Sequence, residues 1–174
     1  MNLKEHTCCF FGHRKIIVTE ELTNNLEIAI ENLIKNENVD TFLFGSKSEF
    51  DRLCLAVTTK LKKKYSHIKR IYVRAEFPYV DENYKAYILK RYEDTYYPEK
   101  IHGSGRAAYV ERNYEMVNNS CFCVVYYDEN YMPPKRKNSR KDLADNQPGS
   151  GTKRAYEYAL KKGVKIINMF EKLW

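Results

Sequence analysis

The sequence TCCFFG at residues 7–12 is a short apolar run that ends in a glycine. A run of this length without polar alternation is typical of a strand that is buried on both faces of a parallel sheet. We expect a helix to follow, because Thr19 is a suitable N-cap and Leu22 and Leu26 begin a helical spacing of apolar residues. The start of the chain therefore predicts a strand and the crossover helix that leads away from it.

The same arrangement recurs along the chain. A second apolar run at residues 41–44 ends at Gly45, and Ser46 with Glu49 has the Ser-x-x-Glu form of a capping box at the start of the next helix. Strands are also expected at residues 68–74, 121–127 and 164–169, and helices at residues 105–118 and 152–162. Five strands that alternate with helices predict an α/β fold of Rossmann-like type, with a mainly parallel sheet and helices on both faces.

Two parts of the chain are harder to assign from their pattern. Residues 76–102 are rich in tyrosine and predict a helix near residues 84–91, followed by a loop. The helix at 105–118 places Ala107, Val110, Tyr114 and Val117 on one face.

A single domain over residues 1–174 is expected, because the composition is that of an ordinary globular protein with 43% hydrophobic and 30% charged residues. Residues 128–147 are polar, with a proline pair and a basic cluster from Lys135 to Lys141, and predict a mobile loop within that domain.

The formal net charge of +7 favours an anionic partner. A small anionic ligand needs far less charge than this, and nucleic acid stays open as a partner. We expect no membrane association and a cytoplasmic protein, because the first residues lack the apolar run of a signal peptide and no stretch approaches the roughly 20 residues of a membrane span. The five cysteines show no Cys-x-x-Cys spacing, so reduced thiols and no metal site are expected. We expect no cofactor, and a homo-oligomer.

Candidate binding residues follow from the expected fold, since ligands of open α/β sheets bind outside the carboxyl ends of the strands. Small residues there let backbone N–H groups approach a phosphate at a helix start, where the helix dipole favours negative charge. The sequence offers four such places, which are Gly12-His13-Arg14, Gly45-Ser46, Gly103-Ser104-Gly105 and Gly149-Ser150-Gly151-Thr152.

Charged side chains near these turns add possible chemistry. Arg14, Arg106 and Arg112 are candidate phosphate clamps, because a guanidinium grips two oxygens at once. His13 is a candidate for hydrogen bonding to a ligand or for proton transfer, but the sequence offers it no dyad partner. Glu49 and Asp51 are the nearest carboxylates and are candidates for a catalytic role.

Several of these motifs together resemble a known family, the YpsA/YoqJ-like proteins of the SLOG superfamily, which also contains the LOG phosphoribohydrolases and DprA. The segments that carry the resemblance span nearly the whole chain in the family's order and are residues 9–14, 44–46, 49–51, 109–117, 150–152 and 155–159. The resemblance implies a Rossmann-like fold and a pocket for nucleotides or nucleotide-derived ligands, including signalling molecules of stress or antiphage systems. The ligand-binding set predicted from the turns and the resemblance is Gly12, His13, Arg14, Gly45, Ser46, Glu49, Arg112, Asn113, Ser150, Gly151 and Thr152.

The chain departs from the hydrolytic members at one position. Those members carry a Pro-Gly-Gly-x-Gly-Thr-x-x-Glu signature, and Ala155 stands here where the catalytic glutamate would be. Glu157 lies two positions further on, about 200° around a helix, and should not replace it.

Three functions are therefore open. The first is a binding protein for a nucleotide or nucleotide-derived small molecule. The second is a nucleotide hydrolase that cleaves a glycosidic bond with help from Glu49 or Asp51. The third is a single-stranded DNA-binding protein of DprA type that uses the basic loop and the tyrosines.

Overall fold

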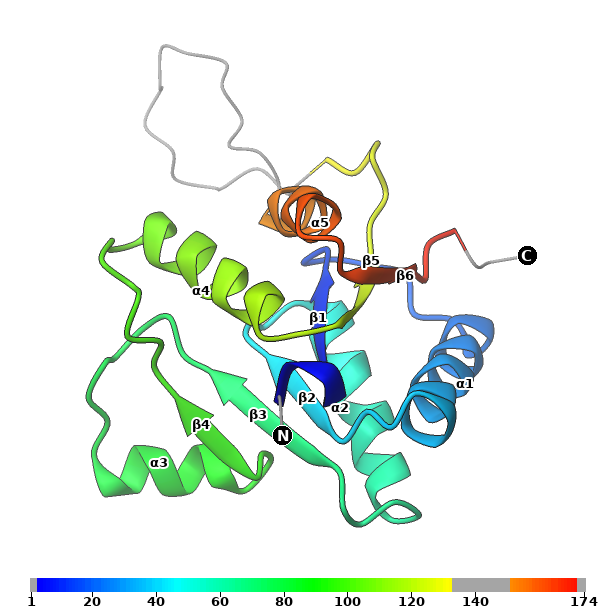
Figure 1. The fold of residues 1–174 in the computed structure, drawn as a ribbon, viewed down its shortest axis with the longest axis horizontal. Coiled ribbons are helices and arrows are strands. Elements are labelled where there is room, and N and C mark those ends of the chain that lie inside the picture. Colours follow the sequence, from blue (N-terminus) through cyan, green and yellow to red (C-terminus); the bar gives the residue numbers. More distant parts are fainter. Residues whose placement is uncertain (1–2, 133–150, 172–174) are drawn as a thin grey trace.

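The computed structural model describes residues 3–132 and 151–171. In these ranges the chain forms a six-stranded sheet in the order β4-β3-β2-β1-β5-β6, with every neighbouring pair parallel (Figure 1). The strands are β1 (Thr7–Gly12), β2 (Thr41–Phe44), β3 (Lys69–Val73), β4 (Asp94–Tyr96), β5 (Phe122–Tyr126) and β6 (Lys165–Asn168). The helices are η1 (Leu3–His6), α1 (Glu20–Asn36), α2 (Glu49–Lys62), α3 (Glu82–Leu89), α4 (Arg106–Asn118) and α5 (Gly151–Lys161). The predicted α/β, Rossmann-like fold is confirmed, with six strands instead of five.

The additional strand is β4, in the part of the tyrosine-rich stretch where a loop was expected. It is three residues long, too short for any periodicity to be read from it. It forms by pairing with β3, and Thr95 donates a side-chain hydrogen bond to the carbonyl of Tyr72 at 2.8 Å. This strand therefore depends on a tertiary contact.

The sheet is covered on both faces, as the alternation along β1 shows. Cys8 and Phe10 belong to the core beneath α1 and α2, whereas Cys9 and Phe11 belong to the core beneath α4 and α5. Figure 1 shows the two helix pairs on opposite sides of the sheet. Apolar runs without alternation were expected for this reason, since both faces of each central strand are buried.

The buried face of α4 differs from the expected one. The buried residues of this helix are Ala108, Arg112, Met116 and Val117. Of the four residues expected to share a face, only Val117 is among them. A pattern of apolar residues could not find this face, because a buried arginine lies in its middle.

The order of the strands reverses at β1. The chain moves outward from β1 through β2 and β3 to β4, then returns to place β5 on the other side of β1. Connections therefore leave the carboxyl ends of β1 and β5 in opposite directions, which is where open α/β sheets bind their ligands.

Candidate functional site

The glycines after β1 and β2 are required for close packing. A Cβ atom at Gly12 would lie 2.3 Å from the Cβ of Phe50, and one at Gly45 would lie 2.7 Å from the Nε of Arg112. Glycine at these two positions lets α2 and α4 approach the strand ends. A contact of either glycine with a ligand stays a prediction.

His13 is buried at the carboxyl end of β1, with 1% of its surface exposed. Its Nε2 accepts a hydrogen bond from the backbone N–H of Asp128 at 2.8 Å, and the ring of Tyr131 stacks on it at a centroid distance of 3.8 Å. A backbone N–H can only donate, so the imidazole proton is on Nδ1. That Nδ1 has no partner in the described residues. Burial lowers the pKa of His13, which favours this neutral form.

The helix cap at the start of α2 lies two residues from the expected position. The N-cap is Ser48, whose hydroxyl accepts a hydrogen bond from the backbone N–H of Asp51 at 3.0 Å. The predicted capping box of Ser46 with Glu49 is therefore wrong. The sequence allowed both assignments, because Ser48 is followed three residues later by an acidic residue just as Ser46 is.

Asp51 is the buried carboxyl group of the site, with 3% of its surface exposed. One of its oxygens, Oδ2, accepts hydrogen bonds from the hydroxyls of Ser46 and Ser48. The other, Oδ1, has no partner in the described part of the chain. Burial raises the pKa of Asp51 to about 6, although the two serine hydroxyls and the charge of Arg112 favour its ionised form.

Glu49 has a different position and different contacts. Its carboxylate accepts a hydrogen bond from the backbone N–H of Ile16 at 2.8 Å and pairs with Lys15 at 3.2 Å. Its own backbone N–H donates to the carbonyl of Arg14 at 3.0 Å. These contacts hold the connection after β1 against the start of α2, and they lower the pKa of Glu49. Glu49 is therefore ionised and engaged, which leaves Asp51 as the carboxyl group with a free oxygen.

Arg112 lies on α4, and its side chain contacts the backbone at the carboxyl ends of β2 and β3. Its Nη1 donates to the carbonyl of Gly45 and, at 3.2 Å, to that of Val73, while its Nε donates to the side chain of Asn113 at 2.8 Å. Two nitrogens of this predicted phosphate clamp, Nε and Nη1, therefore already donate hydrogen bonds to oxygen atoms of the protein itself. The other two candidate arginines, Arg14 and Arg106, are exposed.

Arg74 belongs to the site and was missed from the sequence. It follows β3 directly, is 8% exposed, and donates from Nη1 to the carbonyl of Phe77 at 2.5 Å. Its Nε is buried and has no partner in the described residues. The expected strand at residues 68–74 included Arg74, so the rule that selected residues just after a strand passed over it, whereas the observed strand ends one residue earlier at Val73.

The three unpartnered atoms lie along one edge of the sheet. Within residues 3–132 and 151–171, the buried side-chain nitrogen and oxygen atoms without a hydrogen-bond partner are His13 Nδ1, Asp51 Oδ1 and Arg74 Nε. His13 and Arg74 follow β1 and β3, and Asp51 lies in the first turn of the helix that follows β2, and these three strands are neighbours in the sheet. An unsatisfied buried polar group costs about 1–3 kcal/mol, so each of these atoms needs a partner such as a ligand atom or a bound water.

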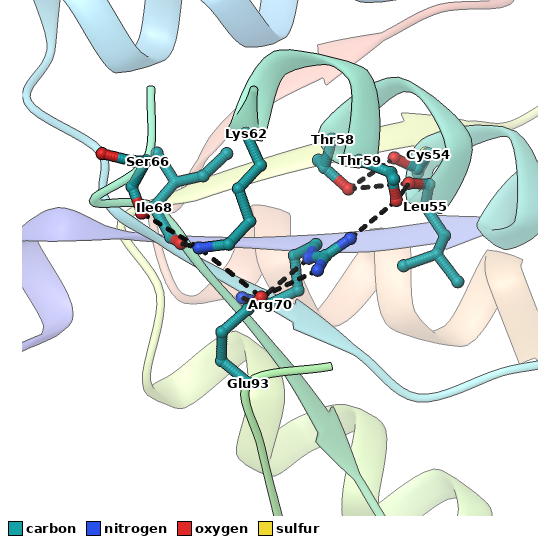
Figure 2. A network of polar contacts seen from close by, with 9 residues as sticks. All are labelled: Cys54, Leu55, Thr58, Thr59, Lys62, Ser66, Ile68, Arg70 and Glu93. Atoms are coloured by element: carbon teal, nitrogen blue, oxygen red, sulfur yellow. Dashed lines mark hydrogen bonds and ion pairs between the residues drawn. The ribbon is translucent and has the colours of Figure 1, made fainter. Parts of the chain in front are cut away.

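The opposite edge of the sheet has a polar network of another kind, shown in Figure 2. Arg70 near the start of β3 donates from Nε and Nη2 to the carboxylate of Glu93 at 3.1 and 2.7 Å, and from Nη1 to the hydroxyl of Thr59 at 2.6 Å. Lys62 donates to the carbonyls of Ser66 and Ile68 at 3.0 and 2.6 Å. A groove of about 510 Å³ beside this network is lined in part by Lys62 and Glu93. Arg70, Lys62 and Glu93 each already have hydrogen-bond or ion-pair partners within the protein.

The glycine loop before α4 already holds an internal anion. The backbone N–H groups of His102 and Gly103 both donate to the carboxylate of Glu111, at 3.0 and 2.9 Å. Gly105, the N-cap residue, has a φ of +58°, a left-handed conformation that favours glycine. Two amides of this loop are therefore already bonded within the chain.

The glycine loop before α5 lies mostly outside the described residues, which exclude Gly149 and Ser150. Gly151 is the first residue of α5, and Thr152 is buried together with Ala155 on the face that packs against the sheet. Glu157 is exposed, so it does not take the place of a glutamate at position 155. The basic cluster Lys135–Lys141 also lies outside the described residues.

Comparison of the chain with protein-family models finds no match, and comparison with curated proteins finds none either. Among the described residues, no helix is long and apolar enough to cross a membrane. In the same residues, no group of three or more His, Cys, Asp or Glu side chains is placed to hold a metal ion.

Proposed function

We propose that this protein binds a nucleotide or a nucleotide-derived small molecule at the carboxyl edge of its sheet, across the ends of β1, β2 and β3. The observation that carries the proposal is the set of unpartnered buried atoms on His13, Asp51 and Arg74. The reversal of strand order at β1 supports the same edge, because ligands of this fold class bind there.

The donor or acceptor character of the three atoms indicates which chemical groups of a ligand suit them. His13 Nδ1–H and Arg74 Nε–H are donors, and the Arg74 group is cationic, so both suit phosphate or carbonyl oxygens. Asp51 Oδ1 is an acceptor when the group is ionised and suits a hydroxyl. A phosphorylated ribose offers anionic oxygens and hydroxyls within one small molecule. A signalling nucleotide is one form of such a ligand.

Binding requires a local rearrangement, because the three atoms are covered in this structure. Tyr131 lies flat on His13, and its hydroxyl accepts a hydrogen bond from the backbone N–H of Lys15 at 3.3 Å. A ligand that reaches Nδ1 therefore displaces side chains at this edge, and Tyr131 is the nearest one to move. Protection of this ring from solvent should change when the ligand binds.

Calorimetry of the intact protein against nucleotides, ADP-ribose derivatives and cyclic dinucleotides tests the proposal. We expect at least one of them to bind and the Arg74→Lys variant, which keeps the charge but loses the Nε–H, to bind it about tenfold more weakly. The matched control is Arg70→Lys at the other edge of β3, which should bind like the unmodified protein. Failure of the folded protein to bind any ligand of the panel would contradict the proposal.

A second candidate, hydrolysis of a glycosidic bond, is favoured by one observation. Asp51 is a buried carboxyl group with a pKa of about 6 and a free oxygen, which are properties of a general acid or base near neutral pH. Chromatographic detection of released base measures this reaction. Turnover should fall at least a hundredfold in Asp51→Asn and persist in Glu49→Gln, and equal turnover in Asp51→Asn would remove Asp51 from the reaction.

A further inference from the structure

The connection from β3 to α3 holds an exposed aromatic ring on a strained backbone. Phe77 has a φ of +57° and keeps 57% of its surface exposed. A bulky residue rarely adopts this left-handed conformation, and such residues cluster at ligand clamps and active sites. Neither burial nor packing in the core explains why this position is a phenylalanine.

The conformation of Phe77 is held by a residue of the proposed site. The carbonyl of Phe77 accepts a hydrogen bond from Nη1 of Arg74 at 2.5 Å. Arg74 itself is fixed by its backbone N–H, which donates to the carbonyl of Tyr96 in β4 at 2.8 Å. The backbone at Phe77 is therefore held by the side chain whose Nε has no partner in the described residues.

Further aromatic rings lie beside Phe77. Tyr84 contacts Phe77 edge to face at a centroid distance of 5.9 Å, and Tyr87 stacks on Tyr84 at 6.3 Å. The exposed ring of Phe77 thus belongs to a group of aromatic side chains beside Arg74.

We infer that Phe77 is the stacking surface for an aromatic base, so that the ligand of this site is a base-bearing nucleotide and not a sugar phosphate alone. This inference rests on the proposed function. The base lies over the end of β3, the ribose lies near Asp51 after β2, and the phosphate points toward His13 after β1. Stacking on an aromatic ring tolerates different bases, so the surface selects for the presence of a base and not for its identity.

The test compares ligands that differ only in the base. Calorimetry measures the binding of AMP, GMP, CMP and UMP, and of ribose 5-phosphate, to the full chain and to its Phe77→Gly and Phe77→Tyr variants. Phe77→Gly removes the ring at a φ that glycine adopts freely, so its melting temperature should equal or exceed that of the unmodified protein. Phe77→Tyr keeps the ring and the strain.

We expect the unmodified protein to bind at least one nucleoside monophosphate about tenfold more tightly than ribose 5-phosphate. This preference should disappear in Phe77→Gly and remain in Phe77→Tyr. Equal binding of ribose 5-phosphate and the nucleotides by the unmodified protein would overturn the inference and leave the proposed function intact. A preference that survives in Phe77→Gly would also overturn it, since the ring would then not be the stacking surface.

Two other outcomes would point instead to a purely structural role of Phe77 or to binding of single-stranded nucleic acid. Equal weakening of all five ligands by Phe77→Gly would show that Phe77 only shapes the site, which contradicts the inference. Binding of a short oligothymidylate that depends on Phe77, without binding of any of the five small ligands, would assign the ring to a single-stranded nucleic acid and overturn both the inference and the proposed function.

Discussion

Two arginines of one strand have opposite surroundings. Arg70 lies near the start of β3, and every nitrogen of its guanidinium group has a protein partner (Figure 2). Arg74 lies just beyond the end of β3 and is equally buried, and its Nε has no partner among residues 3–132 and 151–171. The same residue type therefore stabilises the fold at one edge of the sheet and keeps a donor available for a ligand at the other.

The difference between the edges follows from how a parallel sheet is connected. At the amino edge, the end of α2 and the turn into β3 come together and their polar groups pair with one another, as Lys62 does with the carbonyl of Ile68. At the carboxyl edge, connections leave β1 in one direction and β5 in the other, and in the described residues the polar groups that follow β1, β2 and β3 are not all paired with one another.

Removal of Arg70 should have the largest effect on stability. Arg70→Met leaves the carboxylate of Glu93, with 26% of its side chain exposed, without its principal partner. Breaking a largely buried ion pair on one side costs about 3 kcal/mol, and we expect this loss in the free energy of unfolding measured with urea. A loss below about 1 kcal/mol would show that the amino edge is no better paired than an exposed ion pair.

The pH dependence of stability should reveal Asp51. Its folded pKa of about 6 lies above the ordinary value near 4, so its contribution to stability is complete below about pH 4 and is lost as the pH rises through 6. A shift of this size corresponds to about 2–3 kcal/mol. Asp51→Asn should therefore gain stability relative to the unmodified protein as the pH rises from 4 to 7.

The readout for Asp51 is the difference between the two proteins and not the slope of either one. Burial lowers the pKa of His13, so that residue favours the folded state more as the pH rises, which is the opposite sign. Urea unfolding at pH 4, 5, 6 and 7 measures the difference. Parallel curves for the unmodified protein and Asp51→Asn would rule out a raised pKa for this carboxyl group.

Gly12, at the end of β1, should be required because a side chain there would clash with α2, and not because the backbone needs the conformational freedom of glycine. Gly12→Ala places a Cβ 2.3 Å from the Cβ of Phe50, and overpacking of this kind costs about 2 kcal/mol. Gly151→Ala is the matched control, because nothing lies within 4 Å of its added Cβ, and its stability should change by less than about 0.5 kcal/mol. Thermal unfolding of the two variants compares them directly, and equal melting temperatures would contradict the role assigned to Gly12.

Apart from the control Gly151→Ala, the smallest change in stability is expected at Arg74. Arg74→Met loses the hydrogen bond to Phe77 but also removes the unpartnered Nε, so the free energy of unfolding should change by less than about 1 kcal/mol. Urea unfolding beside Arg70→Met makes the comparison between the two edges. If the two variants are destabilised equally, the distinction between a stabilising edge and a binding edge is wrong.

Much of the fold was predictable because its signals are local. The runs that became β1 and β2 are apolar, short and followed by glycine, and the N-cap predicted at Thr19 is confirmed by its hydrogen bond from Leu22 at 3.0 Å. By contrast, β4 exists through its pairing with β3, and the buried face of α4 includes Arg112. Neither feature has a local signal, because each is stabilised by partners distant in the sequence.

For the site, the sequence by itself determined which turns carry small and charged residues, and hence that His13, Ser46 and Asp51 lie near strand ends. Only the tertiary structure decided which of these groups are already used. Glu49 is held by Ile16 and Lys15, whereas Asp51 and His13 each keep one buried atom without a partner. The physical reason is that hydrogen-bond satisfaction depends on atoms brought together from several strands and helices, and residue order alone does not specify their geometry.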